Sequence, residues 1–194
     1  DGIGVSAKPG QTLLELVRLL NLNTKKLSTE PLAAKIAGEV FTLNYVPVRV
    51  KDALGETVNM RRAMAASGGN ISLLRYNAPA GKDTYVRTAQ FVIFLALNRL
   101  WPHAQVKMSC TLGPGLFISV DQAPDFSVEL LKAEVARIVA DDIPLMRQRV
   151  TTAEAVAHYE TQGQQDKADL LKWRTAEFFD EYVYGDFRDY YYGE

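Results

Sequence analysis

The 194-residue chain is long enough for one large domain or for two small ones, and its 47% hydrophobic content is ordinary for a globular protein. A formal net charge of −1 at pH 7 supplies no overall field that would attract nucleic acid or an acidic membrane, so any RNA contact needs a local basic patch. The single cysteine excludes an intramolecular disulfide and a multi-cysteine zinc site, and without an apolar run of membrane-spanning length the sequence predicts a cytoplasmic protein with no membrane partner.

Residues 1–78 are expected to form a first module of short strands around one helix. Thr12 and Glu15 have the spacing of a capping box, and the apolar residues that follow at helical intervals predict a helix of roughly ten residues. Short strands are predicted at residues 3–7, 32–37, 40–43, 46–50 and 71–76, and a short helix at residues 58–66. Several strands around one helix in a segment of this size indicate a β-grasp-like module.

Residues 79–194 are expected to form a second module with longer helices, after a link rich in chain breakers at residues 77–81. Thr151 and Glu154 have the spacing of a second capping box. The predicted elements are a helix at 84–101, a hairpin of strands at 106–108 and 116–120, a helix at 128–139, a strand at 145–150, and helices at 152–160 and 164–172. The sequence therefore predicts an α+β fold built from two modules.

The last part of the chain is unusually aromatic, because more than half of residues 178–192 are Phe or Tyr. Such a density is typical of a core or an interface and not of a solvated tail. Since the chain also begins at Asp1 without an initiator Met, we expect it to be a fragment of a longer protein.

The side chains that could carry chemistry are few and scattered. His103 and His158 lie in different kinds of segment, with no cysteine or second histidine at ligand spacing, so the sequence predicts no metal site and no catalytic set. Arg147 and Arg149 alternate along one predicted strand and would share a face, which makes them the best candidates for contact with phosphate or RNA. Solvated surface charge is the more common interpretation of such a pair, and it stays open.

Two segments carry a resemblance to a known module. Gly10–Leu16 (GQTLLEL) and Ala33–Glu39 (AAKIAGE) are similar to the β-grasp module called TGS, which occurs at the N-terminus of threonyl-tRNA synthetase and in some GTPases and stringent-response enzymes. The second module resembles the tRNA-editing domain that follows TGS in that synthetase. This likeness rests on Leu100–His103, on Gly115–Phe117, and on the segment from Glu134 through Pro144 to Val150.

The editing family carries an HxxxH and a CxxxH motif around the mischarged aminoacyl end and a hydrolytic water. Counted back from Trp101, the two helix positions are here Arg87 and Phe91, and the other two fall on Asp186 and Tyr190. All four side chains are replaced, so the resemblance implies that this chain does not perform the editing reaction.

A third resemblance is to the N-terminal half of bacterial uridine-kinase-like proteins. It rests on Lys82–Thr88, on Gln162–Lys167 with Leu170–Lys172, and on Gly185–Phe187 with Asp189–Gly193. It implies a non-catalytic binding or regulatory region of an ATP-dependent nucleoside (uridine) kinase. The partner would be the protein's own C-terminal P-loop kinase domain, expected after residue 194, which would use ATP and Mg, while this chain itself would hold no cofactor.

On this interpretation five residues would line the remnant of the editing cleft and bind a small molecule or RNA: Arg87, Phe91, Asp186, Arg188 and Tyr190. A purely structural Arg–Asp pair between the long helix and the terminal segment is the alternative for the charged members. Two other functions stay open for the chain as a whole, an aminoacyl-tRNA editing hydrolase with a rearranged site and a tRNA- or RNA-binding adaptor.

Overall fold

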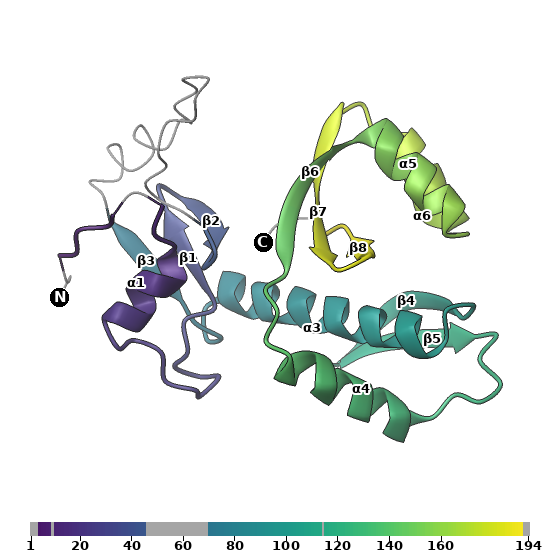
Figure 1. The fold of residues 1–194 in the computed structure, drawn as a ribbon, viewed down its shortest axis with the longest axis horizontal. Coiled ribbons are helices and arrows are strands. Elements are labelled where there is room, and N and C mark those ends of the chain that lie inside the picture. The colour runs from purple at the N-terminus through teal and green to yellow at the C-terminus, as the bar shows by residue number, and fades with distance from the viewer. Residues whose placement is uncertain (1–3, 9, 46–69, 114, 192–194) are drawn as a thin grey trace. The chain divides into compact units, whose positions relative to one another are not determined.

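The computed structural model describes residues 4–8, 10–45, 70–113 and 115–191 (Figure 1). The chain divides into two compact units, residues 1–89 with 193–194 and residues 90–192. The module boundary proposed from the sequence, after residue 78, stays a prediction. The predicted strand at 46–50 and the predicted helix at 58–66 lie outside the described residues.

The helix of the first unit, α1, spans Leu13–Leu19 and begins with the predicted capping box. The Thr12 hydroxyl accepts a hydrogen bond from the Glu15 amide at 3.1 Å, and the Glu15 carboxylate accepts one from the Thr12 amide at 3.0 Å. This reciprocal pair satisfies two backbone donors that the first turn of a helix leaves without partners. The buried face of the helix packs Leu13 and Leu16 against the neighbouring sheet.

That sheet has the order β2-β1-β3, with both pairings antiparallel. Its strands are β1 (Ala33–Ile36), β2 (Glu39–Thr42) and β3 (Ile71–Leu74), which confirms three of the predicted strands. The expected strand at residues 3–7 is wrong over its described part, residues 4–7, which has no strand partner. Apolar alternation alone predicted it, but the segment instead packs Ala7 into the core as irregular chain.

The long helix α3 spans Pro79–Leu100, and the division between the two units falls within it. The predicted link at residues 77–81 is therefore wrong in its second half. Proline is tolerated in the first turn of a helix, where its missing N–H would have no partner in any case. A Cβ at Gly81 would overlap the backbone carbonyl of Arg75, so glycine is needed here for close approach and not as a breaker.

The second unit continues with the predicted hairpin and helix. Strands β4 (Gln105–Leu112) and β5 (Gly115–Asp121) form a two-stranded antiparallel sheet. Helix α4 (Val128–Ala140) follows, and the Ser127 hydroxyl caps it by accepting a hydrogen bond from the Leu130 amide. These elements confirm the expectations for residues 106–139.

A second antiparallel sheet, of order β6-β7-β8, occupies the end of the chain. Its elements and the helical pair inserted between its first two strands are β6 (Met146–Thr151), α5 (Thr152–Thr161), α6 (Gln165–Lys172), β7 (Phe178–Tyr184) and β8 (Phe187–Asp189). The strand and the two helices predicted here are confirmed. Strands β7 and β8 were not predicted.

This sheet contributes apolar side chains to two separate clusters, which explains the aromatic density of the segment. Val150 and Phe179 pack against α5 and α6, whereas Tyr184 and Phe187 pack with residues of α3 and α4. The expectation that these rings belong to a core is confirmed for most of the described residues, whereas Phe178 is 47% exposed. The folded chain is thus a mixed structure with small antiparallel sheets, consistent with the α+β class, and none of its described helices is long and apolar enough to cross a membrane.

Candidate functional site

A shallow polar groove, widely open to solvent, lies beside helix α5 and the sheet of the second unit, with a volume of about 610 Å³. Four of its lining residues have the spacing i, i+3, i+4 and i+7 along α5, so they lie on one face of that helix. The lining residues are Arg149 and Val150 from β6, Glu154, Ala157, His158 and Thr161 from α5, and Arg188 from β8.

Arg188 is held at this groove by a buried carboxylate. Its guanidinium lies 3.5 Å from Glu181 of β7, whose side chain is 0% exposed. The other carboxylate oxygen of Glu181 accepts a hydrogen bond of 3.0 Å from the hydroxyl of Tyr159. Burial, together with the nearby Asp189 and Glu181 carboxylates, raises the pKa of Tyr159, so this hydroxyl stays protonated and remains a donor.

A second ion pair fixes helix α6 to strand β8 behind the groove. The Lys167 ammonium lies 2.6 Å from the Asp189 carboxylate and 5.4 Å from the centre of the Tyr159 ring. Asp189 is almost fully buried, and a buried charge requires a direct partner of opposite sign. Lys167 is that partner. Lys167, Asp189 and Tyr159 are therefore held in place by the ion pair and by the contact of the ammonium group with the Tyr159 ring.

Arg147 and Arg149 both contact Asp180, at 2.6 and 3.4 Å, which confirms that they share one side of strand β6. Burial alone would raise the pKa of Asp180, but the hydrogen bond from Arg147 and the two positive charges lower it overall. One carboxylate therefore faces two guanidinium groups, and the Arg149 side chain remains 71% exposed. Their contact with phosphate or RNA stays a prediction.

His158 lies on the α5 side of the groove and is half-buried. Burial lowers its pKa, and the positive charges of Arg188 and Lys167 lower it further. The imidazole is therefore neutral at pH 7 and offers one donor and one acceptor nitrogen. Within the described residues, no three His, Cys, Asp or Glu side chains are arranged to hold a metal ion.

The residues expected to form the remnant cleft are distributed over different parts of the structure. Phe91 is 1% exposed and packs against the rings of Phe187 and Tyr191, at centroid distances of 5.2 and 6.5 Å. Tyr190 instead contacts the rings of Tyr159 and Phe179, in the cluster beside α5 and α6. Phe91 and Tyr190 therefore belong to separate clusters.

The charged members of that expected set lie on different elements. Asp186 is exposed in the turn between β7 and β8, and Arg87 is half-buried on the part of α3 that belongs to the first unit. Only Arg188 of the five lines the groove. A ligand-binding role for the set stays a prediction.

Sequence reasoning missed that Arg188 lies beside His158 at this groove, and it missed the contribution of α5. A signal was available in the spacing of Glu154, His158 and Thr161, which follow the confirmed capping box of Thr151 at helical intervals. The buried Glu181 gave no such signal, because its burial depends on the pairing of strands distant in sequence from α5.

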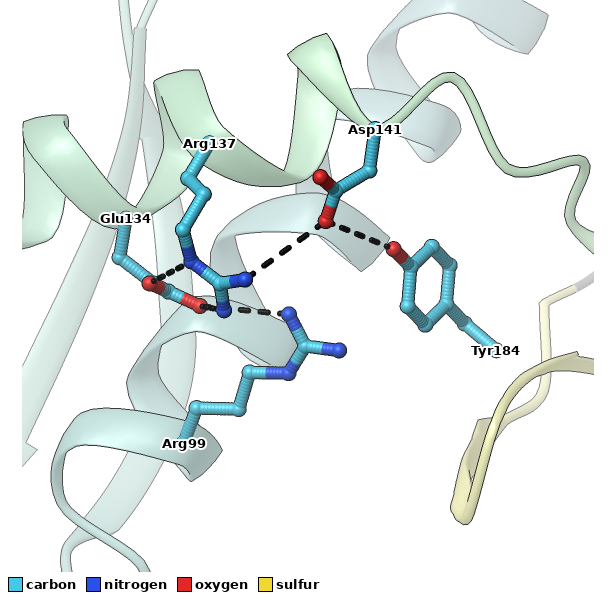
Figure 2. Close-up of polar contacts among 5 residues, drawn as sticks. All are labelled: Arg99, Glu134, Arg137, Asp141 and Tyr184. Atoms are coloured by element: carbon cyan, nitrogen blue, oxygen red, sulfur yellow. Dashed lines mark hydrogen bonds and ion pairs between the residues drawn. The ribbon is translucent and has the colours of Figure 1, made fainter.

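A separate polar cluster ties α3, α4 and β7 together (Figure 2). The Glu134 carboxylate accepts from Arg137 at 2.6 Å and from Arg99 at 3.2 Å. Asp141 lies 3.6 Å from Arg137 and accepts from the Tyr184 hydroxyl at 3.4 Å. The hydrogen bond from Arg137 lowers the pKa of Glu134 most, and the cluster holds the helices against the sheet.

Comparison with known proteins finds similarity to threonine-tRNA ligases, while no protein-family model matches the chain. The ligase of Desulforamulus reducens is 26% identical over 165 residues, which cover 84% of this chain and 23% of the ligase. That of Carboxydothermus hydrogenoformans is 24% identical over 83% of the chain and 23% of its own length. That of Acetivibrio thermocellus is 24% identical over 97% of the chain and 27% of its own length.

These comparisons contradict the interpretation as a regulatory region of a uridine or nucleoside kinase, because the relatives are threonine-tRNA ligases. The kinase resemblance rested on short segments, whereas the ligase similarity extends along most of the chain. The chain spans about a quarter of the length of these curated relatives. Over most of its length, it is therefore similar to a limited region of threonine-tRNA ligases.

Proposed function

We propose that this chain is a tRNA-binding region, built from a TGS-like β-grasp module at residues 1–78 and an editing-domain-like module at residues 79–194. The support is the similarity to ligases whose name specifies tRNA, at 24–26% identity over most of the chain. Binding of this kind needs no metal or other cofactor in the chain itself.

The observation that carries the proposal is the meeting of Arg188 and His158 at one groove beside α5, where the charge of Arg188 acts on the imidazole. Guanidinium groups bind phosphate oxygens through paired, charge-assisted hydrogen bonds, and such contacts supply most of the affinity of proteins for nucleic acids. A neutral imidazole adds a donor that suits a phosphate oxygen or a ribose hydroxyl. The groove therefore offers hydrogen-bond donors for a phosphate at short range, although its arginines have carboxylate partners and the overall charge is −1.

An editing hydrolase is the second candidate, and His158 is the observation in its favour. A neutral imidazole at pH 7 can act as a general base, and Glu154 lies one helical turn away on the same face of α5. Against it, the positions aligned with the editing motifs hold Arg87, Phe91 and Asp186, none of which is an imidazole or a thiol, and Phe91 is packed in the core.

The test is to incubate the purified chain with labelled tRNA and with mischarged threonine-specific tRNA in parallel. The proposal predicts tRNA binding that competitor RNA displaces, together with no release of the amino acid above the uncatalysed rate. Release that His158→Gln abolishes would support the hydrolase instead. Failure to bind any tRNA would contradict both candidates.

A further inference from the structure

The sheet of β6, β7 and β8 has one face that helices α5 and α6 cover (Figure 1). Val150 and Phe179, which are paired in the register of β6 and β7, pack against those helices. Side chains alternate between the two faces along a strand, so the residues on either side of this pair lie on the opposite face. We name that opposite face the Arg149 face, and its residues are Arg147 and Arg149 from β6 and Phe178, Asp180 and Tyr182 from β7.

The Arg149 face carries an exposed aromatic ring at the beginning of β7. Phe178 is 47% exposed, and it belongs to neither of the apolar clusters found in the described part of the second unit. Tyr182, four residues along the same strand, is half-buried against the cluster of α3 and α4. The packed end of the face is therefore at Tyr182, and the accessible end is at Phe178.

The charges of the Arg149 face leave one guanidinium group in excess. Asp180 lies between the two arginines, 2.6 Å from Arg147 and 3.4 Å from Arg149. Two guanidinium groups face one carboxylate, so this cluster is positive by one charge. Arg149 has the longer contact and a side chain that is 71% exposed, so it is the group that can bind a phosphate while Arg147 still compensates Asp180.

Phe178 and Arg149 are close neighbours on this face. In the register of β6 and β7, Arg149 is opposite Asp180, and Phe178 is opposite Thr151. Phe178 and Arg149 are therefore diagonal neighbours, a spacing within reach of an aromatic ring and a long side chain. An exposed ring beside an exposed cation suits single-stranded nucleic acid, because a base can stack on the ring while its phosphate contacts the cation.

We propose that the Arg149 face binds an unpaired segment of RNA, with one base stacked on Phe178 and the adjoining phosphate on Arg149. This inference rests on the proposed tRNA-binding function, and it assigns single-stranded RNA to the side of the sheet opposite to Arg188. A base within a duplex is covered by the base pairs above and below it, so it cannot stack on a ring that projects from a sheet. The Arg149 face therefore selects unpaired nucleotides over duplex RNA.

The experiment measures binding of the whole chain to three labelled probes: a short single-stranded oligoribonucleotide, the same oligomer without bases, and a duplex of the same sequence. We expect the single-stranded oligomer to bind about tenfold more tightly than the other two, because only its bases can stack. Phe178→Leu should weaken its binding roughly tenfold, whereas Phe178→Tyr, which keeps a ring, should retain the affinity. Phe178→Leu should leave the salt dependence unchanged, whereas Arg149→Met should reduce the slope by about 0.7.

Trp173 supplies the matched control, because its ring is 87% exposed at the end of α6, on the side of the sheet that the helices cover. Trp173→Leu should leave the affinity for the single-stranded oligomer unchanged. Equal weakening by Trp173→Leu and Phe178→Leu, or equal binding of the base-free oligomer, would overturn the assignment. A changed oligomeric state of Phe178→Leu with unaltered RNA binding would also overturn it, because the face would then be a protein contact.

The failure of this inference can be told apart from the failure of the proposed function. If tRNA binds the native chain and Phe178→Leu with equal affinity, only the inference fails. If neither tRNA nor the single-stranded oligomer binds the native chain, the proposed function fails with it.

Discussion

The hydroxyl of Tyr159 and the guanidinium of Arg188 contact the same fully buried carboxylate, Glu181, from helix α5 and strand β8. A carboxylate removed from water requires partners of this kind, because an unpaired buried charge is strongly destabilising. Arg188 therefore joins the buried carboxylate to the groove, and its side chain remains 23% exposed.

Removal of Arg188 is the first prediction. Arg188→Met should lower the free energy of unfolding by about 3 kcal/mol, the lower end of the range for breaking a buried ion pair, because Arg188 is partly exposed. The double variant Glu181→Gln with Arg188→Met should recover part of that loss, because it removes the uncompensated charge. Urea unfolding measures both, and equal stability of the single variant and the native chain would contradict the assigned pair.

Replacing Gly81 by alanine should change the stability of the chain in the opposite direction from the usual effect of such a substitution in a helix. An alanine in place of a glycine within a helix normally stabilises by about 0.5–1 kcal/mol. At residue 81 the added methyl group would overlap the backbone carbonyl of Arg75, which cannot move as a flexible side chain can. Gly81→Ala should therefore destabilise the chain by about 2 kcal/mol or more. Thermal unfolding beside an exposed control, Lys82→Ala, measures the effect, and a raised midpoint would contradict the close approach.

Because of the polar cluster around Glu134, we expect the free energy of unfolding to depend on pH in the acid range (Figure 2). The Arg137 hydrogen bond lowers the pKa of Glu134 in the folded state below its ordinary value near 4.5. The stabilising contribution is therefore fully present above that value and is lost as the pH falls below it. Glu134→Gln should flatten the decline of unfolding free energy between about pH 5 and pH 3. Equal decline in the variant and the native chain would show that the cluster does not contribute.

We expect His158 to cause a second pH dependence of the free energy of unfolding, at higher pH than that of Glu134. Burial and the charges of Arg188 and Lys167 lower its folded-state pKa below the unperturbed value of about 6.5. The unfolded chain then takes up the proton first, so stability falls as the pH is lowered through about 6.5. His158→Gln should remove this part of the dependence in urea unfolding between pH 7.5 and 5.5.

The local elements could be predicted because their signals lie within one turn of the chain. Both capping boxes, at Thr12 and at Thr151, depend on side chains three residues apart, and both are present in the structure. The start of α3 was misjudged because Pro79 and Gly81 are chain breakers in most settings, and only the packing of Gly81 against Arg75 shows their use here.

The candidate site was accessible from the sequence only in part. Arg149 and Arg188 were each identified, but for different sites, and the register of β6, β7 and β8 places them on opposite faces of one sheet, which the sequence alone did not reveal. The separation of Phe91 from Tyr190 has the same origin, since the two lie in different clusters around the sheet. Strands β7 and β8 escaped prediction because apolar side chains on both faces remove the polar alternation that marks a surface strand.

The most direct test of the central claim is a salt titration of tRNA binding by the native chain and by Arg149→Met. For contacts to single-stranded RNA, the slope of log affinity against log salt is about −0.7 per phosphate neutralised. We predict a shallow slope of about −1.4 for the native chain, one phosphate for each of the two arginines that border the groove, and a reduction by about 0.7 in the variant. The same slope in both proteins, or tRNA binding that Arg149→Met does not weaken, would contradict tRNA binding at this groove.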